Sequence, residues 1–97
     1  MTTTTEPFAD VPPPAGAART CEWDNTETPA PSRYWMGTRR RASDAEIILD
    51  GTQYSHGPVE RCLTVRGVDC DESMPTDTAR KIGAALMRAA KELDGLK

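Results

Sequence analysis

The sequence predicts an α+β fold: a small antiparallel β-sheet of two or three strands, covered on one face by a single C-terminal α-helix and preceded by a disordered N-terminal tail. Three observations support this fold class: a period-two apolar pattern over residues 58–66, a helical apolar stripe over residues 79–93, and a proline-rich N-terminus. A chain of 97 residues with 5% aromatic residues has material for one small, mostly aliphatic core.

The N-terminal region has the composition of a tail. Six of the eight prolines precede residue 32, and the run Pro12-Pro13-Pro14 favours an extended polyproline II form that buries nothing. We therefore expect residues 1–20 to be disordered and residues 21–97 to form one small domain. Within residues 21–32, Trp23 is the one side chain large enough to contact a core.

The strongest β signal lies in residues 45–55 and 58–66. In the second segment Val59, Leu63 and Val65 alternate with polar residues, which predicts a strand with one buried face. The Ser55–Pro58 tetrapeptide between the segments is typical of a turn, so the two form an antiparallel hairpin. Asp50-Gly51 is a rival turn signal that would split or bulge the first strand. The aromatic segment 33–37 predicts a further short strand.

The C-terminal third predicts a helix over residues 76–93. Pro75 precedes it and Gly95 is suited to ending it. Mid-helix Gly83 costs about 1 kcal/mol relative to alanine, and close backbone packing would explain its presence. The expected apolar stripe consists of Ala79, Ile82, Leu86, Ala90 and Leu93.

This helix also carries a resemblance. The segment "LTVRGVDCDESMPTDTARKIGAALMRAAKELDGL" is similar to the end of many short actinobacterial proteins of unknown function, with a β-hairpin, an acidic loop and a helix of the form A-R-x-x-x-x-A-L-x-x-A-A-x-E-L. The matching residues are Ala79, Arg80, Ala85, Leu86, Ala89, Ala90, Glu92 and Leu93. The resemblance implies an actinobacterial origin, with a phage as the alternative source, and implies no activity. Some such proteins have an N-terminal Cys/Trp/His patch suited to metal; Cys21-Glu22-Trp23 matches its start, without the second Cys or the His.

The main candidate for a binding site is an arginine run in an acidic chain. Arg33, Arg39, Arg40 and Arg41 place four positive charges near Tyr34 and Trp35, and such chemistry holds single-stranded nucleic acid. A second interpretation is that Ser43 is phosphorylated within the basic stretch Arg40-Arg41-Ala42-Ser43. The favoured interpretation is a solvated connection between two strands.

Other chemistry receives little support. The formal net charge of −3 argues against wholesale binding to DNA. Neither a membrane-length apolar run nor a signal peptide is visible, so the sequence predicts a cytoplasmic protein without a membrane partner. Cys21, Cys62, Cys70 and His56 are scattered singly, so we expect no metal and no cofactor. The neighbours Ser55 and His56 do not form a nucleophile–base pair, and the acidic loop 69–72 is explained by solvated carboxylates leading into the helix.

The sequence therefore predicts a small non-enzymatic interaction or regulatory protein. It would bind an unidentified protein partner or itself, through a sheet edge or the helix, and a two-fold dimer is the simplest form. On the helix surface the candidate contacts are Arg80, Arg88 and Lys91. The alternative is a nucleic-acid-binding regulator that uses the Arg39–Arg41 run.

Overall fold

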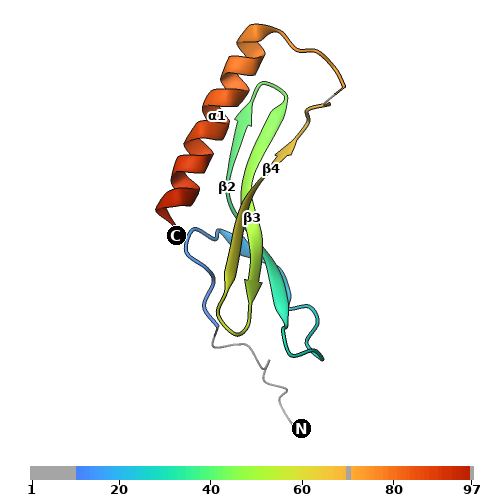
Figure 1. Ribbon diagram of the computed structural model, residues 1–97, viewed down its shortest axis with the longest axis vertical. Helices are drawn as coiled ribbons and strands as arrows, with labels where there is room; N and C mark the ends of the chain where they lie inside the picture. Colours follow the sequence, from blue (N-terminus) through green and yellow to red (C-terminus); the bar gives the residue numbers. More distant parts are fainter. Residues whose placement is uncertain (1–10, 70, 97) are drawn as a thin grey trace.

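The computed structural model describes residues 11–69 and 71–96. In this part of the chain a four-stranded antiparallel meander, ordered β1-β2-β3-β4, is followed by one helix (Figure 1). The elements are β1 (Arg19–Thr20), β2 (Ser32–Ala42), β3 (Ala45–Tyr54), β4 (Val59–Arg66) and α1 (Thr76–Gly95). The predicted fold class, an antiparallel sheet packed on a C-terminal helix, is confirmed. The expected number of two or three strands was too low, because β1 is a two-residue strand in a segment assigned to the tail.

The arginine run lies inside a strand. β2 has 11 residues and pairs with β3 from Ser32, opposite Tyr54, to Ala42, opposite Ala45. The favoured interpretation of the run as a connection between strands was therefore wrong. The connection is the two-residue turn Ser43-Asp44, in which Ser43 has a φ of 56°. The strand that contains Tyr34 and Trp35 continues through the arginines, and its register with β3 shifts between Met36 and Arg39, as at a β-bulge.

The predicted hairpin of residues 45–55 and 58–66 is confirmed as β3 and β4. No turn forms at Asp50-Gly51, because both residues are buried within β3 and pair with Cys62 and Arg61 of β4. The turn falls in the Ser55–Pro58 segment instead, where the amide of Gly57 donates to the carbonyl of Tyr54 at 3.1 Å.

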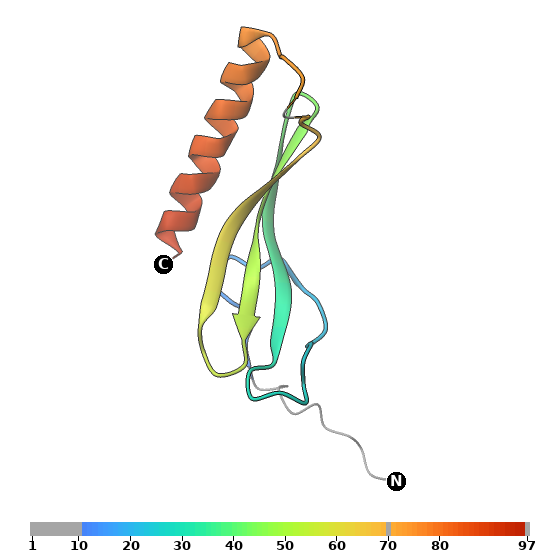
Figure 2. The ribbon, with the colours of Figure 1, turned by 45° about the vertical axis from the view of Figure 1, so that its right-hand side comes forward.

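One face of the sheet carries the core. Figures 1 and 2 show α1 along the upper half of this face, antiparallel to β4. No described helix or strand lies over the opposite face, although Ile48 of that face is fully buried. Trp35 and Leu49 pack against Leu93 near the end of the helix. Ile47 packs against Ala85 and Ala89 further up. We call the opposite side of the sheet the open face.

The buried stripe of α1 is displaced from the predicted one. The residues that are buried are Ala85, Ala89 and Leu93, whereas Ala79 is exposed and Ile82 and Leu86 are half-buried. Alanine at the contact lets the helix approach the sheet closely, so the small side chains face Ile47 and the larger ones flank them. Close packing does not explain Gly83, because a Cβ added there would have no atom within 4 Å.

The described half of the predicted tail is folded onto the sheet. Below the end of α1, Gln53 donates to the carbonyl of Pro12 at 2.7 Å and Arg33 donates to that of Val11 at 3.2 Å. Pro14 is buried. The expectation of disorder was therefore wrong for residues 11–20, while residues 1–10 lie outside the described part. The proline-rich composition predicted an extended backbone that buries nothing. The buried side-chain amide of Gln53 provides a hydrogen-bond donor for the carbonyl of Pro12 in this backbone.

Candidate functional site

The open face has a polar cluster around the buried carboxylate of Asp50. Asp50 is 3% exposed, and its carboxylate accepts hydrogen bonds from the hydroxyl of Tyr34, the hydroxyl of Thr64 (2.8 Å) and the thiol of Cys62 (3.5 Å). The three donors come from β2 and β4, on either side of Asp50 in β3. An ionised carboxylate only accepts, and here both oxygens are engaged by the protein, so the cluster ties three strands together. The sequence analysis missed this cluster. The signal for it was Asp50, an acidic residue that directly follows the apolar run Ile47-Ile48-Leu49.

The cluster changes the titration of its tyrosine. Burial, followed by the hydrogen bond to Asp50, raises the pKa of Tyr34 to about 12. A raised pKa in the folded state means that the native state holds its proton more tightly than the unfolded state, whose tyrosine titrates near 10. The associated stability is present below pH ~10 and is lost as the pH rises through about 12.

We therefore expect the free energy of unfolding to fall between pH ~10 and ~12, with a phenolate absorbance step in the same range. The control is Tyr34→Phe, which should remove this step and leave the titration of Tyr54, whose pKa is raised by its hydrogen bond to Glu60. Denaturant unfolding at a series of pH values measures the first effect and ultraviolet absorbance the second. A Tyr34 phenol that titrates near 10 in the folded protein would contradict the assignment.

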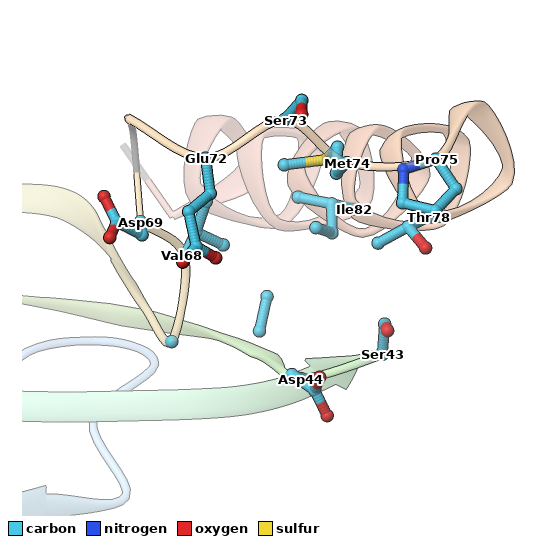
Figure 3. A pocket seen from close by; sticks show the side chains of 12 residues that line it. Ser43, Asp44, Val68, Asp69, Glu72, Ser73, Met74, Pro75, Thr78 and Ile82 are labelled. Carbon is cyan, nitrogen blue, oxygen red and sulfur yellow. The ribbon is translucent and has the colours of Figure 1, made fainter.

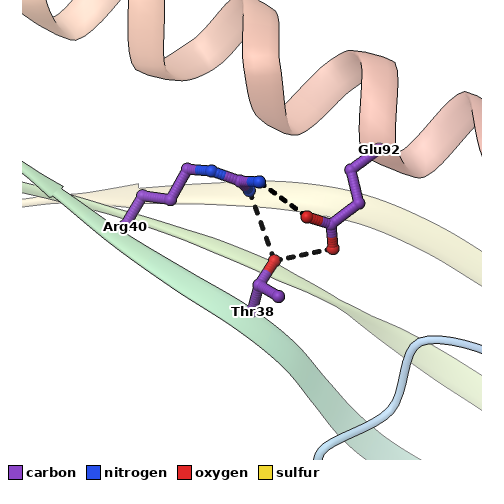
Figure 4. Close-up of polar contacts among 3 residues, drawn as sticks. All are labelled: Thr38, Arg40 and Glu92. Atoms are coloured by element: carbon purple, nitrogen blue, oxygen red, sulfur yellow. Dashed lines mark hydrogen bonds and ion pairs between the residues drawn. The ribbon is translucent and has the colours of Figure 1, made fainter.

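The strand divides the arginine run between the two faces of the sheet. Arg39 lies on the open face and pairs with Glu46 at 2.8 Å, and this hydrogen bond lowers the pKa of that carboxyl. Arg40 points to the helix face, where it bonds Glu92 of α1 at 2.6 Å (Figure 4). Thr38 donates to the same carboxylate at 2.7 Å. These two side chains lower the pKa of Glu92 and fasten β2 to α1.

The four predicted arginine contacts do not form one patch. Arg33 donates to Gln53 at 2.7 Å and lies over the ring of Trp23, 4.5 Å from its centroid. With Arg39 and Arg40 also paired to acceptors, Arg41 is the member of the run that has neither a hydrogen bond nor an ion pair with a described residue. A continuous track of cations, which single-stranded nucleic acid needs, is not formed by these residues.

The helix surface presents the other predicted contacts to solvent. Arg80, Arg88 and Lys91 are exposed, and Arg80 pairs with Asp77 at 3.0 Å. Met87, 74% exposed, lies on the same outer surface. Arg88 also borders a hollow beside the end of β2.

An acidic hollow of about 210 Å³ lies between the start of α1 and the Ser43-Asp44 turn (Figure 3). Its lining includes the apolar side chains of Val68, Met74 and Ile82 and the acidic residues Asp44, Asp69 and Glu72. The carboxylate of Asp69 accepts the amide of Asp71 at 2.9 Å, so it stabilises the loop ahead of the helix. Cys70 lies outside the described residues.

The edge of β4 is the remaining candidate surface. β4 ends the sheet order, so its outer edge has no strand beside it in the described part of the chain. The amide of Tyr54 donates to the carbonyl of Pro58. From this pair, the antiparallel register places the backbone hydrogen bonds between β3 and β4 at every second residue of β4, which are Glu60, Cys62, Thr64 and Arg66. The intervening residues direct their amides and carbonyls away from the sheet; they are Val59, Arg61, Leu63 and Val65.

The cysteines and the histidine weighed as metal ligands do not form a cluster among the described residues. Cys21 and Cys62 are free thiols, and burial raises the pKa of the Cys62 thiol. His56 lies in the hairpin turn with its ring centroid 5.8 Å from that of Tyr54. Among residues 11–69 and 71–96, no group of three or more His, Cys, Asp or Glu side chains is arranged to hold a metal ion. No helix within residues 11–69 and 71–96 is both long and apolar enough to span a membrane.

No protein family model, characterised protein or solved structure matches this chain. The resemblance to short actinobacterial proteins therefore stays a prediction.

Proposed function

We propose that this chain is a small non-enzymatic interaction protein that binds a second copy of itself along β4, giving a two-fold dimer with one continuous sheet. The observation that supports it most is the free β4 edge, which offers outward backbone groups over most of an eight-residue strand. Exposed edges of this length are templates for strand addition unless something blocks them. β4 contains no proline that would block it.

The charges on β4 favour one register. Antiparallel pairing centred on Leu63 places Glu60 opposite Arg66 of the second copy, and the two-fold axis repeats the pair. Both side chains lie on the open face, so each pair brings opposite charges together. Pairing centred on Cys62 would place Glu60 opposite Thr64 and form no such pair. Opposite charges facing each other across strands contribute about 0.2–1 kcal/mol each.

Apolar surface near the axis adds to the proposed contact. Val65, 40% exposed, lies on the helix face of β4 at the sheet edge, and Leu63 beside it is half-buried. In the Leu63-centred register the two Leu63 side chains meet at the axis and Val65 lies opposite Arg61 of the second copy. Removal of this surface from water stabilises the pairing by about 25 cal/mol per Å².

We expect charge reversal to weaken the dimer and double reversal to restore it. Glu60→Arg places like charges opposite Arg66 twice per dimer, which should cost about 1–4 kcal/mol, at least a fivefold increase in Kd. Arg66→Glu should act alike, and the double variant should return Kd close to its original value. Sedimentation equilibrium measures all four proteins.

The matched backbone control is Val65→Pro. The Val65 amide points away from β3, so proline removes an intermolecular donor without removing a bond of the β3–β4 ladder. We expect this variant to be folded and monomeric. If the unmodified chain is monomeric at high concentration, or if Val65→Pro dimerises normally, self-association through β4 is excluded.

A further inference from the structure

The outer edge of β2 is occupied along its first half and free along its second half. In the first half, each residue whose backbone points away from β3 is hydrogen-bonded to the segment 18–24; these residues are Ser32, Tyr34 and Met36. In the second half, Ala42 and Ala45 close the two-residue turn, so alternation directs the backbone groups of Arg39 and Arg41 away from β3. No residue in 11–69 or 71–96 bonds these outward groups. We call them the β2 edge.

The β2 edge carries positive charge on the open face. Arg39 and Arg41 are both exposed there. The hydrogen bond from Arg39 lowers the pKa of Glu46, and the charges of Arg39, Arg41 and Arg66 add to this effect, so three guanidinium groups surround one carboxylate. The excess positive charge opposes pairing with a second copy of the same edge and favours pairing with an acidic strand.

A hollow beside the β2 edge leaves room for side chains on the helix face. It has a volume of about 310 Å³ and lies between the end of β2 and α1. On the helix side it is lined by Lys81, Ala84, Ala85 and Arg88. Successive side chains of a strand point to opposite faces of a sheet, so every second side chain of a strand added here lies on the side of this hollow. The alanines make space for a short side chain.

We propose that the β2 edge binds an extended acidic peptide segment of a partner protein by strand addition. The amides and carbonyls of Arg39 and Arg41 bond the peptide backbone, and peptide glutamates opposite these two residues lie on the open face against their guanidinium groups. The intervening peptide side chains lie on the side of the hollow. A nucleic acid strand has no backbone amides that could continue a sheet, so the free backbone groups favour a peptide. This edge is separate from β4 and does not depend on the proposed dimer.

The test is an amide NMR titration of the full chain with a capped peptide of about eight residues that alternates glutamate and threonine. We expect saturable shifts at the amides of Arg39, Arg41 and Ala84, with Kd at least about fivefold higher in Arg41→Gln. Arg80→Gln is the matched control. Arg80 is an exposed arginine of α1 that does not border the hollow, so this variant should bind with unchanged Kd.

Two altered peptides separate backbone pairing from charge. Methylation of the glutamate amides removes the donors that face β2 and should abolish binding, as should lysine in place of glutamate. The proposal is overturned if the first peptide does not bind, if the methylated peptide binds equally well, or if Arg41→Gln and Arg80→Gln have the same Kd. Shifts confined to Leu63 and Val65 of β4 would also overturn it, as would binding of a single-stranded oligonucleotide at Arg39 and Arg41 without binding of the peptide.

Discussion

Replacing Trp35 with alanine is expected to lower the free energy of unfolding by about 3–5 kcal/mol. Trp35 is fully buried between the sheet and the end of α1, against Leu49 and Leu93. Since domains of this kind are stable by about 5–15 kcal/mol in all, this loss should remove a large fraction of the total stability. Urea denaturation followed by circular dichroism measures the effect.

A second substitution at the same position separates volume from polarity. The indole Nε1 of Trp35 is buried without a hydrogen-bond partner in the described structure. Trp35→Phe removes this unsatisfied donor while keeping an aromatic ring, so it should cost clearly less than Trp35→Ala. A loss below about 1 kcal/mol for Trp35→Ala would show that this side chain is not central to the core.

The second large effect is expected at Gly51. A Cβ there would lie 1.8 Å from the carbonyl oxygen of Glu60 and 3.1 Å from Nε1 of Trp35. The first of these atoms is backbone, so β4 would have to move away from β3 to make room. We expect Gly51→Ala to destabilise the fold by about 3 kcal/mol, at the upper end of the cost of overpacking.

Gly83→Ala is the matched control for this substitution. The same methyl group added at Gly83 meets no atom within 4 Å, and helix propensity favours alanine there by up to about 1 kcal/mol. The two changes should therefore shift Tm in opposite directions in parallel thermal melts. A tolerated Gly51→Ala would mean that β3 and β4 are not as close as the structure has them.

The sequence predicted those elements whose apolar period matches their final environment. The β3–β4 hairpin and the C-terminal helix each show a face of side chains at the correct spacing, and both formed where expected. The arginine run was wrongly assigned to a connection because three consecutive arginines are typical of solvent, whereas alternation along β2 places Arg39 and Arg40 on opposite faces, each next to an acceptor. Glu46 and Glu92 are 7 and 52 residues away from their arginines, so no local pattern identifies them.

The same limit applies to the candidate sites. The cluster around Asp50 requires Tyr34, Cys62 and Thr64 to meet across three strands. Strand register brings these residues together, and it is not encoded in short motifs.

The central claim is that two copies join along β4 in one register. It is tested most directly by isotope-filtered NMR on a mixture of labelled and unlabelled chains. In antiparallel sheets, residues in non-hydrogen-bonded pairs have their Cα atoms about 4.5 Å apart. The Leu63-centred register therefore predicts an intermolecular Hα–Hα contact between Cys62 and Thr64 of the second copy. A contact between the two Cys62 residues would show a different register, and a dimeric sample with no intermolecular contact from β4 would contradict the account.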